Sequence, residues 1–188
     1  LLVCGAGTVA ANLVEGYAAL FPSLETVLVW NRTTARAEKL VTSLAHPGVK
    51  VFVAVDLEAA AGEADIVSTA TMASEPFLAG EWLKPGAHVD LIGAYTLQMR
   101  EADDAVLTRG ELFVDSRKTT IGHIGEIQNP LDRGVITEAD IRGDFYDLVA
   151  GRAGRSGREA VTVCKNGGGA HLDLMVAGLI ERVVSPSP

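Results

Sequence analysis

Short runs of apolar residues alternate with longer, amphipathic stretches over the first 115 residues. The runs are rich in Val, Leu and Ile, and they are continuous rather than alternating, which indicates strands that are covered on both faces. We expect strands at 1–4, 26–30, 49–55, 66–69, 88–92 and 112–114. Between them, apolar spacings of three and four predict helices at about 9–20, 37–44, 57–62 and 100–107. This alternation predicts an α/β fold with a doubly wound, mostly parallel sheet and helices on both faces.

The pattern loosens after residue 115. Residues 119–158 give no clear period, and the glycine-containing segment 151–157 (GRAGRSG) indicates a loop. A last strand at 161–165 and a helix at 170–184 follow. We therefore expect one nucleotide-binding-type domain over 1–165, followed by a C-terminal helix and tail over 166–188.

Composition and charge exclude several classes of protein. The chain has 188 residues, 48% of them hydrophobic, and a formal charge of −8, without a block of Lys and Arg; we expect no nucleic-acid partner. No apolar run approaches the ~20 residues that cross a bilayer, so we expect no membrane segment. Cys4 and Cys164 lie far apart, which argues against a disulfide framework or a metal site and favours a reducing, cytoplasmic location. Because the first residues, Leu1–Cys4, already form a buried strand pattern without a Met, we expect that residues upstream are missing.

The strongest motif is Gly5-Ala6-Gly7-Thr8-Val9-Ala10, which fits G-x-G-x-x-A between a strand and a helix. Gly5 permits a tight turn, Gly7 lets a pyrophosphate approach the backbone, and the helix N-terminus attracts its charge. The motif predicts a Rossmann-type domain that binds a dinucleotide through Gly5, Ala6, Gly7, Thr8 and Val9. The alternative is a glycine turn in an α/β protein without a nucleotide.

The end of the second strand carries Asn31-Arg32-Thr33. A site that prefers NAD has Asp or Glu here, which binds the ribose hydroxyls and repels a 2′-phosphate. Asn, Arg and Thr can all donate to that phosphate, and Arg32 can bind it through two hydrogen bonds. We predict NADPH as the cofactor, with NADH possible as a second one. In the alternative, Thr33 only caps the next helix and Arg32 points to solvent.

Ligands of doubly wound sheets bind beyond the carboxyl ends of the strands. We therefore expect the nicotinamide half of the site to be lined by residues of three such loops: Thr69, Ala70, Thr71, Met72, Ile92, Tyr95 and Asn166. His46 and His88 are expected to be structural, whereas His123 and His171, beside glycines, are better functional candidates. We expect Asp90 to be hydrogen-bonded within its strand and Asp103-Asp104 to be a solvated helix face.

Several segments in order resemble the ornithine cyclodeaminase/mu-crystallin family: GAGTVA (5–10), WNRT (30–33), TATMASEP (69–76), WLKPGAHVDLIG (82–93), FVDS (113–116) and GEI (125–127). The resemblance implies a Rossmann domain joined to an N-terminal domain that binds substrate and forms a homodimer. It also implies that the C-terminal segment folds back towards that domain. The carboxylate-binding Arg and Lys residues of the family belong to the N-terminal domain, so the catalytic residues are unknown here and we expect this chain alone to be inactive.

Within the family, residues 88–101 (HVDLIGAYTLQMRE) most resemble the NAD(P)H-dependent reductases of cyclic ketimine carboxylates. Those enzymes convert Δ1-pyrroline-2-carboxylate to proline and Δ1-piperideine-2-carboxylate to pipecolate. True ornithine cyclodeaminases have a catalytic Asp where this chain has Tyr95, which argues against a lyase. An ornithine cyclodeaminase-type lyase, an amino-acid (alanine) dehydrogenase and a mu-crystallin-like binding protein remain alternatives.

Overall fold

A computed structural model describes residues 1–44 and 48–185 of the chain. Eight strands form one sheet in the order β3-β2-β1-β4-β5-β8-β6-β7, and all seven pairings between the described strands are parallel. The strands are β1 (Leu2–Cys4), β2 (Thr26–Trp30), β3 (Lys50–Val53), β4 (Ile66–Thr69), β5 (His88–Leu91), β6 (Glu111–Val114), β7 (Ile141–Asp144) and β8 (Thr162–Lys165). The expected doubly wound, parallel α/β fold is confirmed.

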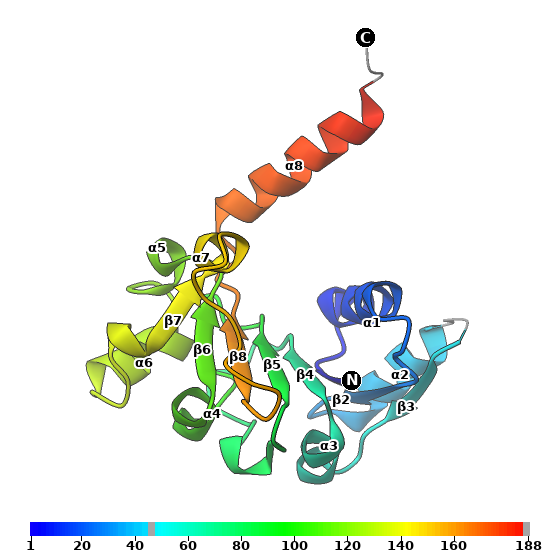
Figure 1. The fold of residues 1–188 in the computed structure, drawn as a ribbon. Coiled ribbons are helices and arrows are strands. Elements are labelled where there is room, and N and C mark those ends of the chain that lie inside the picture. The colour runs from blue at the N-terminus through cyan, green and yellow to red at the C-terminus, as the bar shows by residue number, and fades with distance from the viewer. Residues whose placement is uncertain (45–47, 186–188) are drawn as a thin grey trace.

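Helices cover both faces of this sheet (Figure 1). One face carries α1 (Thr8–Leu20) and α2 (Thr34–Ser43), and the other carries α3 (Leu57–Glu63), α4 (Asp104–Arg109) and α6 (Gly125–Asp132). Two apolar cores result, and β1 contributes to both, because successive side chains point to opposite faces. Val3 packs with α1 and α2, whereas Leu2 and Cys4 pack with the other set of helices.

The helix expected near Arg100–Leu107 is shorter than predicted. Only α4, from Asp104 onward, is helical; Ala102 instead forms an isolated parallel bridge with Leu78. The buried carboxylate of Glu126 accepts the backbone N–H groups of Glu101 and Ala102, which holds them outside any helix. The apolar spacing over this stretch could not reveal a partner 25 residues away in the sequence.

Asp103 and Asp104 are also not the solvated helix face that we expected. Asp103 is the N-cap of α4, and its carboxylate accepts from the backbone N–H groups of Val106 and Gly80. Asp104 forms ion pairs with Arg100 at 3.0 Å and Arg133 at 2.6 Å. Both carboxylates therefore tie α4 to neighbouring segments.

Residues 119–158 contain regular structure that the sequence did not indicate. Besides α6 they hold a strand, β7, two short helices, α5 (Arg117–Thr120) and α7 (Phe145–Val149), and a 3-10 turn over Glu138–Asp140. The strand β7 reads IRGD and lies at the edge of the sheet, so it has too few apolar residues to show a period. A second 3-10 turn, at Gly80–Trp82, completes the elements of the described residues.

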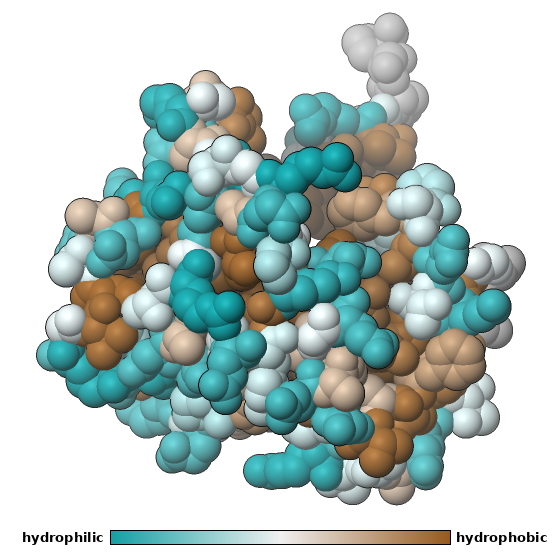
Figure 2. Space-filling view, turned by 60° about the horizontal axis from the view of Figure 1, so that its bottom comes forward, coloured by the Kyte–Doolittle hydropathy of each residue, from teal (hydrophilic) through white to brown (hydrophobic). Residues whose placement is uncertain are grey.

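The last helix, α8 (Ala170–Val184), has the bounds expected from the sequence. It projects from the body of the molecule, and none of its residues is buried (Figure 1). Apolar side chains lie below the grey C-terminal atoms in Figure 2, whereas hydrophilic residues are spread over much of the face in front. No helix among the described residues is both long and apolar enough to span a membrane. His46, the turn around it and the tail from residue 186 lie outside the described residues.

Candidate functional site: a cleft at the carboxyl edge of the sheet

The chain reverses its direction of winding between β1 and β4, and the loops that follow these two strands touch each other. The backbone N–H of Ala70 donates to the carbonyl of Cys4 at 2.7 Å, and that of Gly5 donates to the carbonyl of Trp30 at 2.8 Å. A cleft of about 460 Å³ opens at this point. It is lined by three segments and a helix turn: Gly5, Ala6, Gly7, Trp30, Asn31, Arg32, Thr33, Arg36 and the residues from Ala70 to Glu75, with Phe77. Such a switch point is where doubly wound sheets bind ligands.

Gly5 and Gly7 occupy different environments. Gly5 has φ +127, and a Cβ on it would lie 2.6 Å from the carbonyl oxygen of Ala70, so only glycine fits this turn. A Cβ on Gly7 would meet no atom within 4 Å, and Gly7, Thr8 and Val9 are exposed. Gly7 is the N-cap of α1 and has no side chain that could bond to the first-turn N–H groups. The start of α1 therefore presents backbone donors to open space, as an anion site requires.

Two arginines lie at the β2 end of the cleft. Arg32 lines it as expected, and Arg36, in the first turns of α2, joins it from the next helix. Asn31 donates its side-chain N–H to the carbonyl of Thr33 at 2.9 Å, so this amide shapes the loop. Thr33 is the N-cap of α2, as the alternative reading held, but its hydroxyl caps no N–H group of that helix. Arg36 was missed from the sequence, where it looked like one of several polar positions on α2.

The walls of this end are aromatic. Trp30 and Phe77 stack with ring centroids 5.2 Å apart and an angle of 23° between their planes. Among the lining residues, Glu75 carries the one carboxylate. Two guanidinium groups against one carboxylate make this end of the cleft suited to an anionic ligand.

The remaining expected site residues do not line the cleft itself. Thr69 is fully buried, and Asn166 is half-buried, with its backbone N–H bonded to the carbonyl of Leu91 at 3.0 Å. Tyr95 is 58% exposed and Ile92 half-buried, both beyond the end of β5. Thr8 is exposed on α1, and Val9 borders a separate apolar hollow with Leu13, Tyr17 and Leu20. The structure thus brings nine of the expected residues together in the cleft: Gly5, Ala6, Gly7, Asn31, Arg32, Thr33, Ala70, Thr71 and Met72.

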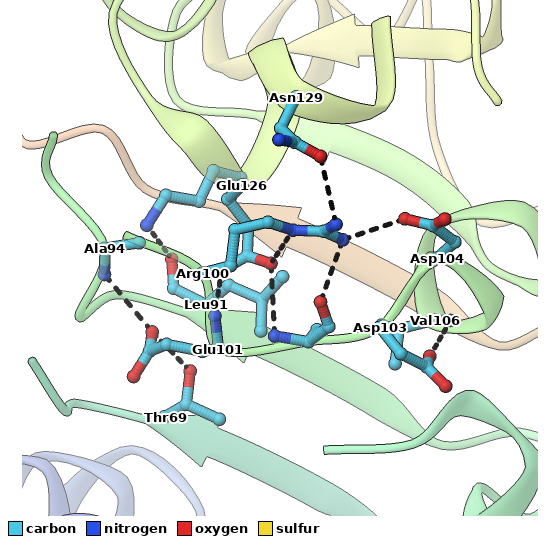
Figure 3. A network of polar contacts seen from close by, with 12 residues as sticks. Thr69, Leu91, Ala94, Arg100, Glu101, Asp103, Asp104, Val106, Glu126 and Asn129 are labelled. Carbon is cyan, nitrogen blue, oxygen red and sulfur yellow. Dashed lines mark hydrogen bonds and ion pairs between the residues drawn. The ribbon is translucent and has the colours of Figure 1, made fainter. Parts of the chain in front are cut away.

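Behind the loops that follow β4 and β5 lies a fully buried carboxylate, Glu101, which the sequence did not single out (Figure 3). Its Oε2 accepts from the Thr69 hydroxyl and the Gly93 N–H, each at 2.7 Å, and from the Ala94 N–H at 3.3 Å. Its Oε1 accepts from both the N–H and the hydroxyl of Thr71 at 2.7 Å. The carboxylate therefore has five hydrogen-bond partners, three backbone N–H groups and two hydroxyls. Periodicity gave no signal for it, because an acidic residue next to Arg100 looks like a surface position.

A second buried glutamate supports the first. Glu126 accepts the backbone N–H of Glu101 at 2.7 Å and lies 3.9 Å from the guanidinium of Arg100. Burial raises the pKa of Glu126 to about 7, although the N–H bonds from Glu101 and Ala102 act in the opposite direction. Lys165, also fully buried, donates to the carbonyl of Leu91 at 3.0 Å, and burial lowers the pKa of its ammonium group. The two loops are therefore backed by a layer of buried charge.

His88 and Asp90 have structural surroundings, whereas His123 is exposed. His88 Nδ1 lies 2.8 Å from the Thr162 hydroxyl, and Asp90 accepts from Tyr17 and Ser68, as expected. His171 Nε2 lies 3.8 Å from Asp115 Oδ2, and neither atom has a hydrogen-bond partner among the described residues. The part of the chain that the structure describes holds no group of three or more His, Cys, Asp or Glu residues arranged to bind a metal.

The glycine turn, open helix N-terminus and two arginines can hold a phosphate-bearing ligand. Comparison with known proteins shows the family of the chain. Residues 1–186 match the ornithine cyclodeaminase/mu-crystallin family over nearly the whole chain. The chain belongs to this family. The resemblance read from its motifs is confirmed.

Individual relatives narrow the comparison. The chain is 53% identical over 186 residues to the Delta(1)-pyrroline-2-carboxylate reductase of Paracoccus denitrificans, and 38% identical over 180 residues to the ketimine reductase mu-crystallin of Rattus norvegicus. Its structure is similar, with a TM-score of 0.89 and 27% identity, to that of Thermococcus litoralis Delta(1)-pyrroline-2-carboxylate reductase in complex with NADH and L-proline.

The chain is shorter than all three of these proteins. The matches cover 98%, 96% and 100% of this chain, but only 59%, 54% and 60% of the respective relatives. The shared region therefore spans little more than half of each relative.

Proposed function

We propose that the protein is an NADPH-dependent reductase of cyclic ketimine carboxylates, and that this chain is its cofactor-binding part. The observation that carries the proposal is the 53% identity to a Delta(1)-pyrroline-2-carboxylate reductase over 98% of the chain. The preferred substrates are Δ1-pyrroline-2-carboxylate and Δ1-piperideine-2-carboxylate, and the products are proline and pipecolate.

The lining of the cleft suits two parts of NADPH, the pyrophosphate and the adenosine 2′-phosphate. Gly5, Gly7 and the open start of α1 would receive the pyrophosphate, because they offer backbone N–H groups and no Cβ that would block a close approach. Arg32 and Arg36 would receive the adenosine 2′-phosphate, with no carboxylate at the end of β2 to repel it. The preference for NADPH over NADH rests on these two arginines.

The residues of this cleft would hold the cofactor, and the chemistry supplied there would be a hydride for C2 of the imine, with a proton for the ring nitrogen. The reaction requires donor and acceptor carbons held roughly 3–3.5 Å apart, so the chain's contribution is positioning. The nicotinamide half would be bordered by residues at the ends of three strands: Thr69 at the end of β4 with Ala70, Thr71 and Met72 after it, Ile92 and Tyr95 after β5, and Asn166 after β8. All three loops leave the carboxyl edge of neighbouring strands.

The assembly of the whole protein is part of the proposal. We place residues 1–165 in the cofactor domain and assign 166–188 to a segment that returns towards a substrate domain not contained in this chain. The apolar side chains that α8 exposes, among them Leu174, Leu179 and Ile180, support this arrangement. We further propose that the complete protein is a homodimer, and that it works in a reducing, cytoplasmic compartment, where Cys4 and Cys164 stay free.

The test is a pair of measurements on the complete protein. Fluorescence titrations with NADPH and NADH give the cofactor preference, and initial rates with both cyclic imines give the activity. We expect tighter binding of NADPH and turnover of at least one imine. Turnover of pyruvate with ammonia, or of ornithine, in place of the imines would instead identify an alanine dehydrogenase or a cyclodeaminase. Cofactor binding without any turnover would indicate a binding protein.

A further inference from the structure

One carboxylate joins the two loops that border the nicotinamide half of the cleft. Glu101 receives three hydrogen bonds from residues at the end of β4, through Thr69 and Thr71, and two from residues after β5, through Gly93 and Ala94. Figure 3 shows it between Thr69 and Ala94. Four of the five distances are 2.7 Å, at the short end of the range for hydrogen bonds.

The two loops pack closely against each other at this junction. A Cβ on Gly93 would overlap both the backbone of Thr71 and the carboxylate of Glu101. The two loops are therefore in van der Waals contact, with the carboxylate against their junction. If the carboxylate were lost, the N–H groups of Thr71 and Ala94 would lose their acceptor in a partly or fully buried place, whereas the N–H of Gly93 would keep its bond to the carbonyl of Thr69 at 3.2 Å. Two orphaned N–H groups are a large cost for the loops in their present positions.

The arginine end of the cleft does not depend on this carboxylate. Arg32 and Arg36 belong to the β2–α2 connection, whose loop is held by its own bond from Asn31 to Thr33. Glu101 has no hydrogen bond to any residue of that connection. At the arginine end, Phe77 donates its backbone N–H to the backbone carbonyl of Glu101 at 3.0 Å, so the bonds of the Glu101 carboxylate itself are confined to the loops after β4 and β5.

We propose that Glu101 is the positioning residue for the nicotinamide half: it fixes the loops after β4 and β5 relative to each other, and so sets where the reacting ring lies. The proposal rests on the proposed function for the identity of the cofactor. Glu126 supports this role from behind, because it holds the backbone N–H groups of Glu101 and Ala102.

The decisive variant is Glu101→Gln in the complete protein. A glutamine keeps the size, but its NH2 group would face N–H groups that cannot rotate away, so the two loops separate. We expect the affinity for NADPH to fall by ~10-fold or more, the fluorescence gain of the bound nicotinamide to shrink, and kcat with imine to fall at least as much. The affinity for 2′,5′-ADP, which probes only the adenosine half, should stay within about 2-fold of the unsubstituted protein.

The matched control is Glu111→Gln. Glu111 is another buried glutamate, but it lies at the opposite, amino end of β6, where it pairs with Arg142 and accepts from the Ser156 N–H. We expect this variant to keep both affinities and kcat within about 2-fold. Equal losses in both variants would mean that buried glutamates serve stability alone, and would overturn the proposal.

A milder variant covers the case in which Glu101→Gln does not fold. Thr69→Val removes a single donor to Glu101 with almost no change in volume. It should lower NADPH affinity and kcat by ~3-fold or more, again without effect on 2′,5′-ADP. Unchanged NADPH binding in this variant, or parallel loss of 2′,5′-ADP affinity, contradicts the positioning role. Because NADPH fluorescence needs no substrate, a failure of the imine assay in the unsubstituted protein would count against the proposed reaction and not against Glu101.

Discussion

At the scale of single residues, the choice of cofactor depends on the side chains after β2. Arg32→Asp replaces a donor to the 2′-phosphate by a carboxylate in a cleft that otherwise contains Glu75 as its one acid. The affinity for NADPH should fall by at least ~10-fold, while that for NADH is retained or rises, because Asp can accept from the ribose hydroxyls. Fluorescence titration of both cofactors measures the ratio.

The control for this substitution is Lys39→Asp, which makes the same change of charge at an exposed position further along α2. It should leave the ratio of the two affinities unchanged. Equal loss of NADPH and NADH binding in Arg32→Asp would mean that Arg32 does not contact the phosphate. Arg36 would then be the arginine to substitute next.

At the scale of elements, the local spacing of apolar residues predicted the strands and helices that form from interactions within a short stretch of the chain. The strands β1, β2 and β4 and the helix α8 appear where the apolar spacing put them, and Gly5 needs its glycine because its φ is +127. The cleft residues that follow β1 and β2 in the chain were also predicted from the sequence, because the local pattern gave the ends of these two strands.

The elements that the sequence did not reveal depend on distant contacts. Ala102 is extended because Glu126 binds its N–H and Leu78 pairs with it, and the polar edge strand β7 forms only where β6 offers it a neighbour. Glu101 and Glu126 belong to a residue type that is usually exposed, yet both are fully buried. No pattern in a single sequence separates a buried, fully bonded acid from a solvated one.

Glu126, the buried glutamate of α6 that binds the segment before α4, should make the free energy of unfolding depend on pH. Because the pKa of Glu126 is about 7 in the folded protein against an ordinary 4.5, the folded state binds more protons between these values. Its contribution is fully present below pH 4.5 and is lost as the pH rises through about 7, roughly 3 kcal/mol in all. Urea unfolding of the complete protein between pH 4.5 and 8 should show this decline, and Glu126→Gln should abolish it.

Glu111→Gln is the control for this experiment, because the pKa of Glu111 is shifted in the opposite direction to that of Glu126. The hydrogen bond from Ser156, together with Arg142, lowers the pKa of Glu111, so its contribution is present above the ordinary pKa of 4.5 and is lost only at more acid pH. The Glu111→Gln variant should therefore show the same change in the free energy of unfolding between pH 5 and 8 as the unsubstituted protein. A Glu126→Gln protein with the unsubstituted slope would show that other groups cause the pH dependence.

At the scale of the whole molecule, α8 contacts the described body through His171 in its first turn, whereas most of the rest of the helix is exposed. Met175, Leu179 and Val183 recur every four residues, so they share one face of the helix, and each is more than half exposed. Exposed apolar side chains on one helix face mark a contact surface when they adjoin one another. In our proposal this face packs against the part of the protein that lies outside this chain.

The substitution Leu179→Asp in the complete protein tests that arrangement. If the face is covered, a buried, unpaired carboxylate should cost roughly 3 kcal/mol or more, lower the unfolding temperature and weaken the dimer seen by size-exclusion chromatography. Glu181→Lys changes the charge on the opposite side of the helix, about 200° round its axis, and should have little effect. Unfolding temperature and oligomeric state that are the same in both variants would mean that α8 stays uncovered. The return of residues 166–188 to a second domain would then be wrong, whereas the cofactor cleft, which contains no residue of α8, would be unaffected.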